Sequence, residues 1–436
     1  MLGEGGEHVS AVVEEVVQPC PRCGADIRGD GRFSPWCVRC EWNVDPEGPE
    51  EQPGRLERVR RALARRYGEQ LLAEVSAGGE LRARRDASSV LAGVIALAVH
   101  GLTLALAAAS TWCVVRYWGG PALVLGIVLL TLAFALRPRP LGLPEDVPLL
   151  RRADAPGLFA LVDEVARAAG TRGVDVIAVD GRVNASVMAY GLRGRRLLTL
   201  GMPLWEILSP QERIALLGHE LGHYANGDAR HGLVVGTAYR SLYTWRYVMA
   251  PLPDPTLVQA VANALLGVLS WLVRGVMMLL DRLTMRASQR AEYLADRTAA
   301  RAGSTEAAVR MLDRLLLSDS VVTALNREVN AAARGGAHSG GRDDTRANGL
   351  WEHLVADLDS VPELERERLR RAGALRGHSV DDTHPPTHLR QQCLLVGEPV
   401  PATVTCDQET TGAIAAELAE ARRKVARRIL RDGVAG

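Results

Sequence analysis

Two histidines and a glutamate form the pattern with the clearest chemistry. In His219-Glu220-Leu221-Gly222-His223 the two histidines are four residues apart. On a helix both imidazoles therefore project from one face and could share a tetrahedral Zn²⁺ ion. Glu220 would lie beside them, where it could accept a proton from a water molecule that attacks a carbonyl group. The pattern indicates metal-assisted hydrolysis, with a surface histidine pair at helical spacing as the alternative.

A third metal ligand has to come from elsewhere in the chain, because a catalytic zinc ion usually keeps three protein ligands and one open position. The best candidate is Glu292, which Asp296 follows four residues later on the same helical face. We predict that Glu292 binds the metal. We also predict that Asp296 accepts a hydrogen bond from a ligand histidine and so fixes the tautomer of its ring. The alternative is that this acidic pair forms a solvated helix face.

Four cysteines near the N-terminus have the spacing of a structural metal site. Two Cys-x-x-Cys pairs are separated by 13 residues and comprise Cys20, Cys23, Cys37 and Cys40. Each pair can form a tight knuckle, and four thiolates make a closed tetrahedral site. The spacing predicts a zinc ribbon, with a rubredoxin-like iron site or four ordinary thiols as alternatives. Thiolates persist best under reducing conditions, which indicates a cytoplasmic N-terminus.

Short local signals predict the elements that position these residues. Ser209 as N-cap, Pro210 at the first helical position and Glu212 at the third predict the start of the helix that carries both histidines. Strands are predicted over 174–179 and 196–200. Further helices are predicted over residues 55–77, 155–169, 292–328, 351–374 and 411–431.

Two apolar segments predict a transmembrane hairpin. Residues 90–115 contain His100 as the only ionisable side chain apart from cysteine, and residues 119–136 contain no charged side chain. A bilayer core requires about 20 apolar residues per helix. Arginines are frequent on both flanks of the hairpin and scarce in its turn, which by the positive-inside rule places both flanks in the cytoplasm. The alternative is a hairpin buried in a large soluble core.

Two later segments are also apolar. Residues 257–280 are interrupted only by Arg274 and predict a further membrane helix. Residues 232–250 carry Arg240 and Arg246, and an arginine at the bilayer centre costs about 3 kcal/mol. This segment could therefore span the membrane, lie at its surface or pack as a core helix.

Composition excludes several classes of protein. The 436 residues include 52 basic and 51 acidic side chains, so the net charge of +1 argues against a globally basic nucleic-acid-binding protein. Hydrophobic residues make up 47% of the chain, which excludes wholesale disorder. Seven cysteines are an odd count in a long chain, which argues against a disulfide scaffold. The N-terminus lacks a basic and then apolar stretch, so we expect no cleavable signal peptide.

Changes in composition divide the chain into parts. We expect an α+β, mainly helical fold. The expected parts are a tail (1–17), the zinc ribbon (18–45), an Arg-rich linker or helix (46–87), the transmembrane hairpin (88–136), a metallopeptidase core (137–330) with one or more membrane helices within 232–280, a flexible loop (331–350) and a C-terminal helical part (351–436).

From about residue 90 to 395 the chain resembles the family of membrane zinc endopeptidases that contains the heat-shock protease HtpX and the type 1 CAAX prenyl proteases. The hairpin, the histidine pair and the Glu-x-x-x-Asp helix carry the resemblance, together with two more segments. Asn184-Ala185 resembles the edge-strand motif of the family. The His-Pro-Pro segment that begins at His384, with Arg390 six residues later, resembles its C-terminal motif.

This resemblance implies a gluzincin-type peptidase domain whose site faces the cytoplasm. An extended substrate could pair with an exposed strand over 183–191, at Asn184 and Ala185. The run of residues after Asn184 is longer than the usual form of the motif, so the substrate register stays open. His384 and Arg390 could stabilise the oxyanion formed at the scissile carbonyl. The alternative for the C-terminal segment is a solvated loop with a Pro-Pro turn.

We therefore predict an integral-membrane zinc endopeptidase that cleaves membrane or membrane-associated proteins at the cytoplasmic face. The expected cofactors are one catalytic and one structural Zn²⁺ ion. The expected partners are the bilayer, protein or peptide substrates and a protein partner of the ribbon, with no nucleic acid. We expect a multi-pass protein of the cell membrane with both termini cytoplasmic.

The alternative function is a non-enzymatic membrane adaptor whose ribbon recruits a protein or nucleic-acid partner. The ribbon is remote in sequence from the peptidase motifs, so we expect a separate module that residues 46–87 tether.

Overall fold

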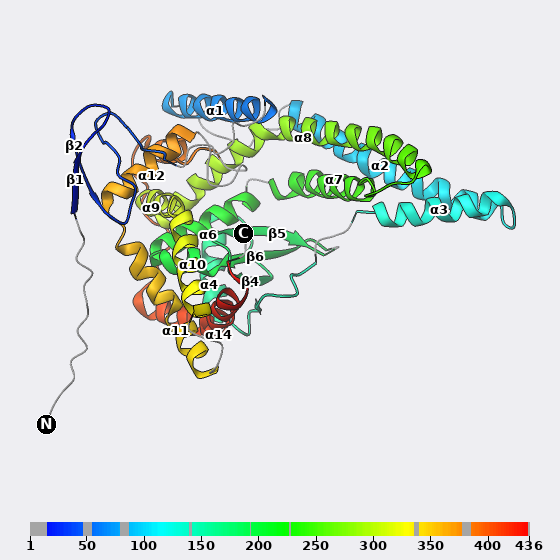
Figure 1. Cartoon of the computed structure of the whole chain (residues 1–436). Helices are drawn as coiled ribbons and strands as arrows, with labels where there is room; N and C mark the ends of the chain where they lie inside the picture. The colour runs from blue at the N-terminus through cyan, green and yellow to red at the C-terminus, as the bar shows by residue number, and fades with distance from the viewer. Residues whose placement is uncertain are drawn as a thin grey trace.

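The fold is mainly helical with two small β-sheets, as the α+β prediction requires (Figure 1). The structure is a computed structural model. It describes residues 15–46, 55–78, 87–138, 142–191, 193–225, 228–334, 340–376 and 385–434.

The N-terminal module is a two-stranded antiparallel sheet with two turns that carry the cysteines. β1 (Glu15–Pro19) pairs with β2 (Asp26–Asp30). The first strand thus begins inside the segment that we expected as a tail (1–17). Residues 15–46 are called the ribbon from here on. α1 (Arg55–Ser76) follows as the helix predicted within the Arg-rich linker.

The larger sheet has the strand order β3-β4-β6-β5. β4 (Val176–Asp180) and β6 (Arg195–Gly201) are parallel and confirm the two predicted strands. β3 (Leu149–Leu150) runs antiparallel to β4, and β5 (Ala185–Tyr190) antiparallel to β6. Among the described residues no strand pairs with the outer edge of β5, so the edge predicted over 183–191 is a strand edge.

One face of this sheet packs against helices to form the main core. Ile177 and Leu198 from the central strands are fully buried there. α4 (Pro156–Ala169) and α6 (Pro210–Ala225) contribute to the same core, and α5 (Met202–Ile207) joins β6 to α6. The helix that carries the histidine pair is thus held by the sheet and its covering helices.

A single helix of 47 residues joins the apolar segment to the predicted metal ligand. α8 (Leu257–Gly303) covers the predicted membrane segment 257–280 and continues without a break through Glu292, where we expected a separate helix. The sequence from 281 to 302 contains neither glycine nor proline that would interrupt it. At 1.5 Å per residue, Glu292 lies about 18 Å beyond the apolar part.

α2 (Ala87–Arg116) and α3 (Pro121–Leu136) form the predicted hairpin, which extends away from the sheet (Figure 1). By length and composition α2 and α8 could each cross a membrane, whereas α3 is shorter. Many of their large apolar side chains are exposed, including Val94, Leu97, Leu104, Val124, Phe134, Leu265 and Trp271. A soluble core would bury these side chains, so their exposure favours the membrane interpretation.

α7 (Asp228–Val248) covers most of residues 232–250, which could span the membrane, lie at its surface or pack as a core helix. Ala238 and Leu242 are buried in a cluster shared with α2 and α8. The Tyr239 hydroxyl donates a hydrogen bond to the Met277 carbonyl of α8 at 3.0 Å. This packing favours a helix that belongs to the same bundle over one that lies alone at the membrane surface.

The C-terminal half consists of helices that close the core. α11 (Gly340–Asp359) and α12 (Glu363–Arg376) divide the predicted helix 351–374 at Pro362, because proline cannot continue a helix. The remaining helices are α9 (Thr305–Leu315), α10 (Ser318–Arg334), α13 (Thr387–Leu395) and α14 (Gln408–Asp432).

The prediction of a flexible loop over 331–350 is wrong for the residues of this segment that the structure describes. α10 continues to Arg334, and α11 already begins at Gly340. The glycines suggested a loop, but Ala347 and Trp351 are four residues apart and both are buried in the main core. An apolar face at helical spacing decides the structure here, and not the glycine content.

Candidate metal centres

α6 begins as the sequence predicts. The Ser209 side chain accepts a hydrogen bond from the Glu212 backbone N–H at 3.4 Å, and the Ser209 N–H donates to Glu212 Oε2 at 2.9 Å. This reciprocal pair is a capping box. The helix then presents His219, Glu220 and His223, and the two imidazole rings have centroids 4.9 Å apart.

Two glycines bring α6 into close contact with α8. A Cβ atom on Gly218 would lie 2.9 Å from Ala302 Cβ, and one on Gly222 would lie 3.0 Å from Ala295 Cα. No such contact is tolerated without a shift of the helices. Gly218, just before the motif, and Gly222, within it, therefore set the distance between the helix with the histidines and the helix with Glu292.

The three predicted ligands converge across this contact. His219 Nε2 is 3.4 Å from Glu292 Oε2, and His223 Nε2 is 3.6 Å from Glu292 Oε1. One donor atom from each residue lies within 4.8 Å of the others. A tetrahedral zinc ion with N and O ligands has donor–donor distances of about 3.3–3.6 Å. The residues therefore fit a zinc ion.

Asp296 lies behind His219, where the sequence places it. Its Oδ1 atom is 3.0 Å from His219 Nδ1. Burial raises the pKa of Asp296, but Arg390 and His219 outweigh burial and lower this pKa to about 2. Burial lowers the pKa of His219, but hydrogen bonds with Asp296 and Glu292 raise it to about 10. The carboxylates thus favour positive charge at Nε2, which a proton or a metal ion can supply.

Arg390 is buried beside Asp296. Its side chain is 3% exposed, and it donates to both oxygens of Asp296, at 2.8 Å from Nε and 2.6 Å from Nη2. Nη2 also lies 3.4 Å from His219 Nδ1. The same Nη2 atom lies 3.7 Å from Glu292 Oε2, so the guanidinium is close to a predicted metal ligand as well as to Asp296. The oxyanion role that we predicted for Arg390 stays a prediction, and the contacts with Asp296 suggest a positioning role beside it.

His384 lies outside the described residues, so its oxyanion role stays a prediction. The described part of the segment resumes at Pro385, and the Pro386 carbonyl accepts a hydrogen bond from the Arg390 N–H at 3.2 Å. The Pro-Pro pair therefore begins the short α13 that carries Arg390 into the core.

The centre is more open at one ligand than at the other. The His223 side chain is 23% exposed, whereas that of His219 is 5% exposed. Glu220 is buried on the same helix. β5 lies beside α6, and the Asn184 side chain accepts a hydrogen bond from the Ala185 N–H at 2.8 Å at the start of this strand. The structure thus brings the predicted substrate edge next to the histidine helix.

The four cysteines of the ribbon form a second candidate centre. Cys20 Sγ lies 3.6 Å from Cys40 Sγ, and Cys23 Sγ lies 3.6 Å from Cys37 Sγ. With Zn–S bonds of about 2.3 Å, the edge of a tetrahedral zinc site is about 3.8 Å. The backbone N–H of Cys40 lowers the pKa of the Cys37 thiol to about 6, which favours the thiolate that binds metals. These residues fit a closed structural site.

Both cysteine knuckles turn in the same way. The residues that follow the second cysteine of each pair, Gly24 and Glu41, have φ angles of 72° and 57°. The Gly24 N–H donates to the Cys20 carbonyl, and the Glu41 N–H donates to the Cys37 carbonyl. The left-handed conformation suits glycine and strains glutamate, so the second knuckle depends more on its surroundings.

Sequence reasoning missed two features of the catalytic centre. Gly218 precedes the histidine motif and Gly222 lies within it, four residues later on the same helical face, a signal of close helix contact that we did not use. The ion pair between Arg390 and Asp296 joins residues that are 94 positions apart, and no local signal in a single sequence indicates it.

Comparisons with known proteins agree with this centre. A model of Peptidase family M48 matches residues 153–395, more than half of the chain. The match includes both histidines, Glu292 and Arg390, whereas the ribbon and the α2–α3 hairpin lie outside it.

Curated proteins named as proteases are also similar. Protease HtpX of Pseudomonas putida (strain W619) is 28% identical over 225 residues, which is 50% of this chain and 71% of that protein. Protease HtpX of Pseudomonas fluorescens is 27% identical over the same length. Protease HtpX homolog 1 of Sulfurisphaera tokodaii is 37% identical over 81 residues, or 18% of this chain and 25% of that protein. No solved structure matches the chain.

Proposed function

The chain belongs to peptidase family M48, and we propose that it is an integral-membrane zinc endopeptidase that cleaves membrane or membrane-associated proteins at the cytoplasmic face. The observation that carries the proposal is the convergence of His219, His223 and Glu292 around one point, with Glu220 on the same helix. An adaptor without activity would have no need to keep these four side chains together.

The chemistry follows from this arrangement. A Zn²⁺ ion held by His219, His223 and Glu292 would supply a Lewis acid that polarises the scissile carbonyl group. Glu220 would accept a proton from the attacking water and deliver it to the leaving amine nitrogen. Because these groups are largely buried, their charges act with little screening by solvent.

We assign Asp296 and Arg390 to the orientation of His219. Asp296 would hold the proton on Nδ1, which leaves the Nε2 lone pair for the metal. Arg390 keeps Asp296 ionised and fixed through two hydrogen bonds. His384, which belongs to the same His-Pro-Pro segment, remains our candidate for stabilising the oxyanion.

The substrate would bind as an added strand. The outer edge of β5 carries no strand among the described residues, and β5 itself lies beside the histidine helix. An extended peptide paired with Asn184, Ala185 and the residues that follow would receive backbone hydrogen bonds that do not depend on its sequence. Such recognition suits an endopeptidase with varied protein substrates.

The exposed apolar surfaces of α2, α3 and α8 support a position in the membrane. α8 would leave the bilayer after its apolar part and reach Glu292 about 18 Å further on, so the catalytic centre would lie near the membrane surface. The excess of arginine beside the hairpin supports a cytoplasmic position for this surface. Reporter fusions at residues 50, 200 and 430 test this topology, and an external position for residue 200 would overturn it.

Metal analysis distinguishes the peptidase from the adaptor. We expect two zinc ions per purified chain, one of which a chelator removes readily. Removal should abolish cleavage of an unstructured peptide, and added Zn²⁺ should restore it. Two tightly held zinc ions with no cleavage under any condition would favour the adaptor, whose function would then reside in the ribbon.

A further inference from the structure

The ribbon packs against α12 and does not stand apart as a tethered module (Figure 1). Arg371 of α12 donates a hydrogen bond to the Val38 carbonyl at 2.9 Å. Val38 lies between Cys37 and Cys40, so this arginine contacts the second cysteine knuckle itself. The same guanidinium lies over the Trp36 ring, 5.2 Å from its centroid.

Further arginines strengthen this contact. Arg368 donates to the Val44 carbonyl at 2.9 Å. Arg376 forms an ion pair with Asp45 at 2.5 Å. From the ribbon side, Arg32 donates to the hydroxyl and the carbonyl oxygen of Ser360 in the turn before α12, both at 3.0 Å. The carbonyl groups of the folded knuckle are thus partners of α12.

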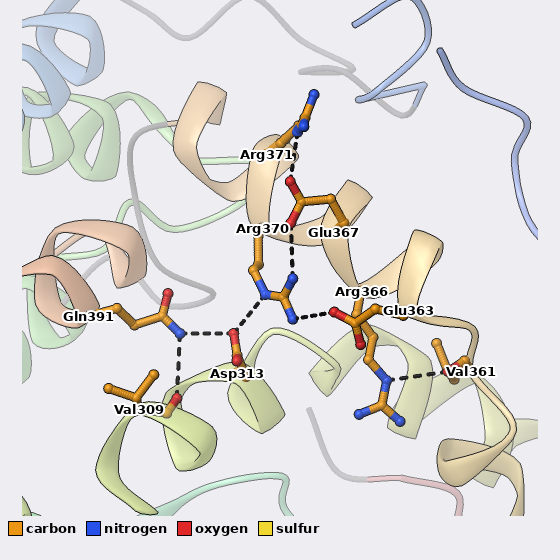
Figure 2. Close-up of polar contacts among 9 residues, drawn as sticks. All are labelled: Val309, Asp313, Val361, Glu363, Arg366, Glu367, Arg370, Arg371 and Gln391. Atoms are coloured by element: carbon orange, nitrogen blue, oxygen red, sulfur yellow. Dashed lines mark hydrogen bonds and ion pairs between the residues drawn. The ribbon is translucent and has the colours of Figure 1, made fainter. Parts of the chain in front are cut away.

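A chain of polar contacts continues from α12 into α9 (Figure 2). Glu367 accepts hydrogen bonds from Arg371 and Arg370, both at 2.9 Å. Arg370 in turn donates to Asp313 of α9 at 3.0 Å. The guanidinium that touches the ribbon is therefore linked to α9 through one carboxylate and one further arginine.

The last step reaches the helix behind the catalytic centre. Gln391 donates to Asp313 at 2.8 Å and to the Val309 carbonyl at 3.4 Å (Figure 2). Gln391 directly follows Arg390 in α13, a helix of nine residues. Asp313 therefore accepts hydrogen bonds from both α12 and α13. α13 also carries Arg390, which binds Asp296 next to His219.

We propose that the ribbon is a metal-dependent positioning element of the catalytic centre. Metal in the four-cysteine site keeps the second knuckle in the shape that α12 binds. Arg370 of α12 then binds Asp313 of α9, and Asp313 accepts a hydrogen bond from Gln391 of α13. This contact keeps α13 in the position from which Arg390 orients Asp296. The availability of metal to the ribbon would thereby regulate the peptidase.

Physical reasoning supports the dependence on metal. The ribbon has a small core around Cys20, Ile27 and Cys37, and modules of this size rarely fold without their metal. Loss of the metal would remove the Val38 carbonyl from Arg371 and leave this arginine and Arg370 free to change partners. A loosened α13 would shift Arg390 slightly, and a metal ligand responds to small shifts of its supporting groups.

The test uses the full-length protein in detergent, with zinc left in the ribbon and Co²⁺ in the centre of His219, His223 and Glu292. Arg371→Ala keeps every metal ligand but removes the contact with the knuckle. Asp313→Asn keeps an oxygen acceptor for Gln391 but removes the charge that holds Arg370. Arg366→Ala is the matched control, because Arg366 lies on the same helix and donates to the Val361 and Leu358 carbonyls at the α11–α12 junction, away from the ribbon and from Asp313.

We expect Arg371→Ala and Asp313→Asn to lower kcat for an unstructured peptide by about 2- to 30-fold with little change in KM, as is typical for coupled networks. Both should shift the Co²⁺ absorption bands, and Arg366→Ala should change neither quantity. Together the two substitutions should reduce kcat no further than the stronger one alone, because they break one path. Additive losses, or spectra identical to that of the unsubstituted protein, would overturn the proposal.

A ribbon variant tests the metal dependence. Cys37→Ser combined with Cys40→Ser should reduce kcat as much as Arg371→Ala does and shift the Co²⁺ bands in the same direction. A fully active variant with an empty ribbon would show that the ribbon is a separate module. This inference rests on the proposed function only for the kinetic readout. If the unsubstituted protein cleaves no peptide, the proposed function fails, while the Co²⁺ spectra still decide whether the ribbon and the centre are coupled.

Discussion

The two candidate metal centres of this chain are built in opposite ways. All four ligands of the ribbon lie within residues 20–40 and are brought together by two tight turns. The ligands of the catalytic centre come from α6 and α8, which residues 226–256 separate in sequence. One centre is made by local backbone conformation, and the other is made by the packing of two helices.

This difference predicts what each centre does without metal. The ribbon buries few apolar side chains, so its fold depends on the metal that crosslinks it. The catalytic ligands are held by a large core and by the buried pair of Asp296 and Arg390, so their positions should survive the loss of the ion. A centre that remains in place can exchange and activate its metal, whereas a centre that unfolds serves as a structural or sensing element.

Glu220→Gln is the sharpest test of the catalytic centre, because it removes the proposed general base. All metal ligands remain, so the zinc content should not change. Loss of the general base should lower kcat/KM for an unstructured peptide by about 10²–10⁴-fold. The measurements are peptide cleavage and metal content of the purified protein. Glu164→Gln, on an exposed position of α4, is the control, and near-normal cleavage by Glu220→Gln would disprove the assigned mechanism.

Asp296→Asn tests whether the catalytic centre is held by its own supporting groups. The amide can still contact His219 but carries no charge for Arg390. We expect zinc affinity or activity to fall by about 10- to 100-fold, the usual effect of losing such a supporting carboxylate. Competition with a zinc chelator measures the affinity, and circular dichroism monitors folding, because the buried Arg390 would lose the charge of the carboxylate that it contacts most closely.

Asp163→Asn is the matched control for this substitution. Asp163 pairs with Arg152 on the protein surface, with 34% of its side chain exposed, so its loss should leave zinc binding unchanged. Equal zinc affinities for Asp296→Asn and the control would show that the ligands do not need this support, and the contrast between the two centres would weaken.

Gly222→Ala tests whether helix packing sets the catalytic centre. The new methyl group would lie 3.0 Å from Ala295 Cα, which should force α6 away from α8 and cost about 1–3 kcal/mol of unfolding free energy. Gly412→Ala in α14 meets no atom within 4 Å and should stabilise the protein by up to about 1 kcal/mol. Thermal unfolding measures both, and a stabilising Gly222→Ala would contradict the role of this contact.

The same contrast explains how much could be predicted from the sequence. The ribbon and the histidine pair were predictable because their ligands lie within a few turns of one another, where spacing alone determines geometry. Glu292 was found only because the histidines required a third ligand. The hairpin followed from apolar length, and the core strands from short apolar runs.

The remaining features depend on contacts that a single sequence does not reveal. Arg390 is one of 52 basic residues, and nothing in its neighbours distinguishes a buried partner of Asp296 from an oxyanion donor. The contact of the ribbon with α12 uses backbone carbonyl groups, which every residue has. The helix over 340–350 is stabilised by a core that forms only when α11 meets α14 and α10.

The smallest expected effect concerns the ribbon contact itself. Arg376 and Asp45 form an ion pair whose side chains are 36% and 14% exposed, so its loss should cost no more than about 1 kcal/mol. Arg376→Ala should therefore speed amide hydrogen exchange in residues 36–45 by about two- to fivefold while zinc stays bound. Arg65→Ala removes an exposed pair with Glu69 in α1 and should leave this exchange unchanged. If exchange in Arg376→Ala rose by orders of magnitude, the ribbon would depend on α12 more than on its own metal, and the two centres would be alike in being held by packing.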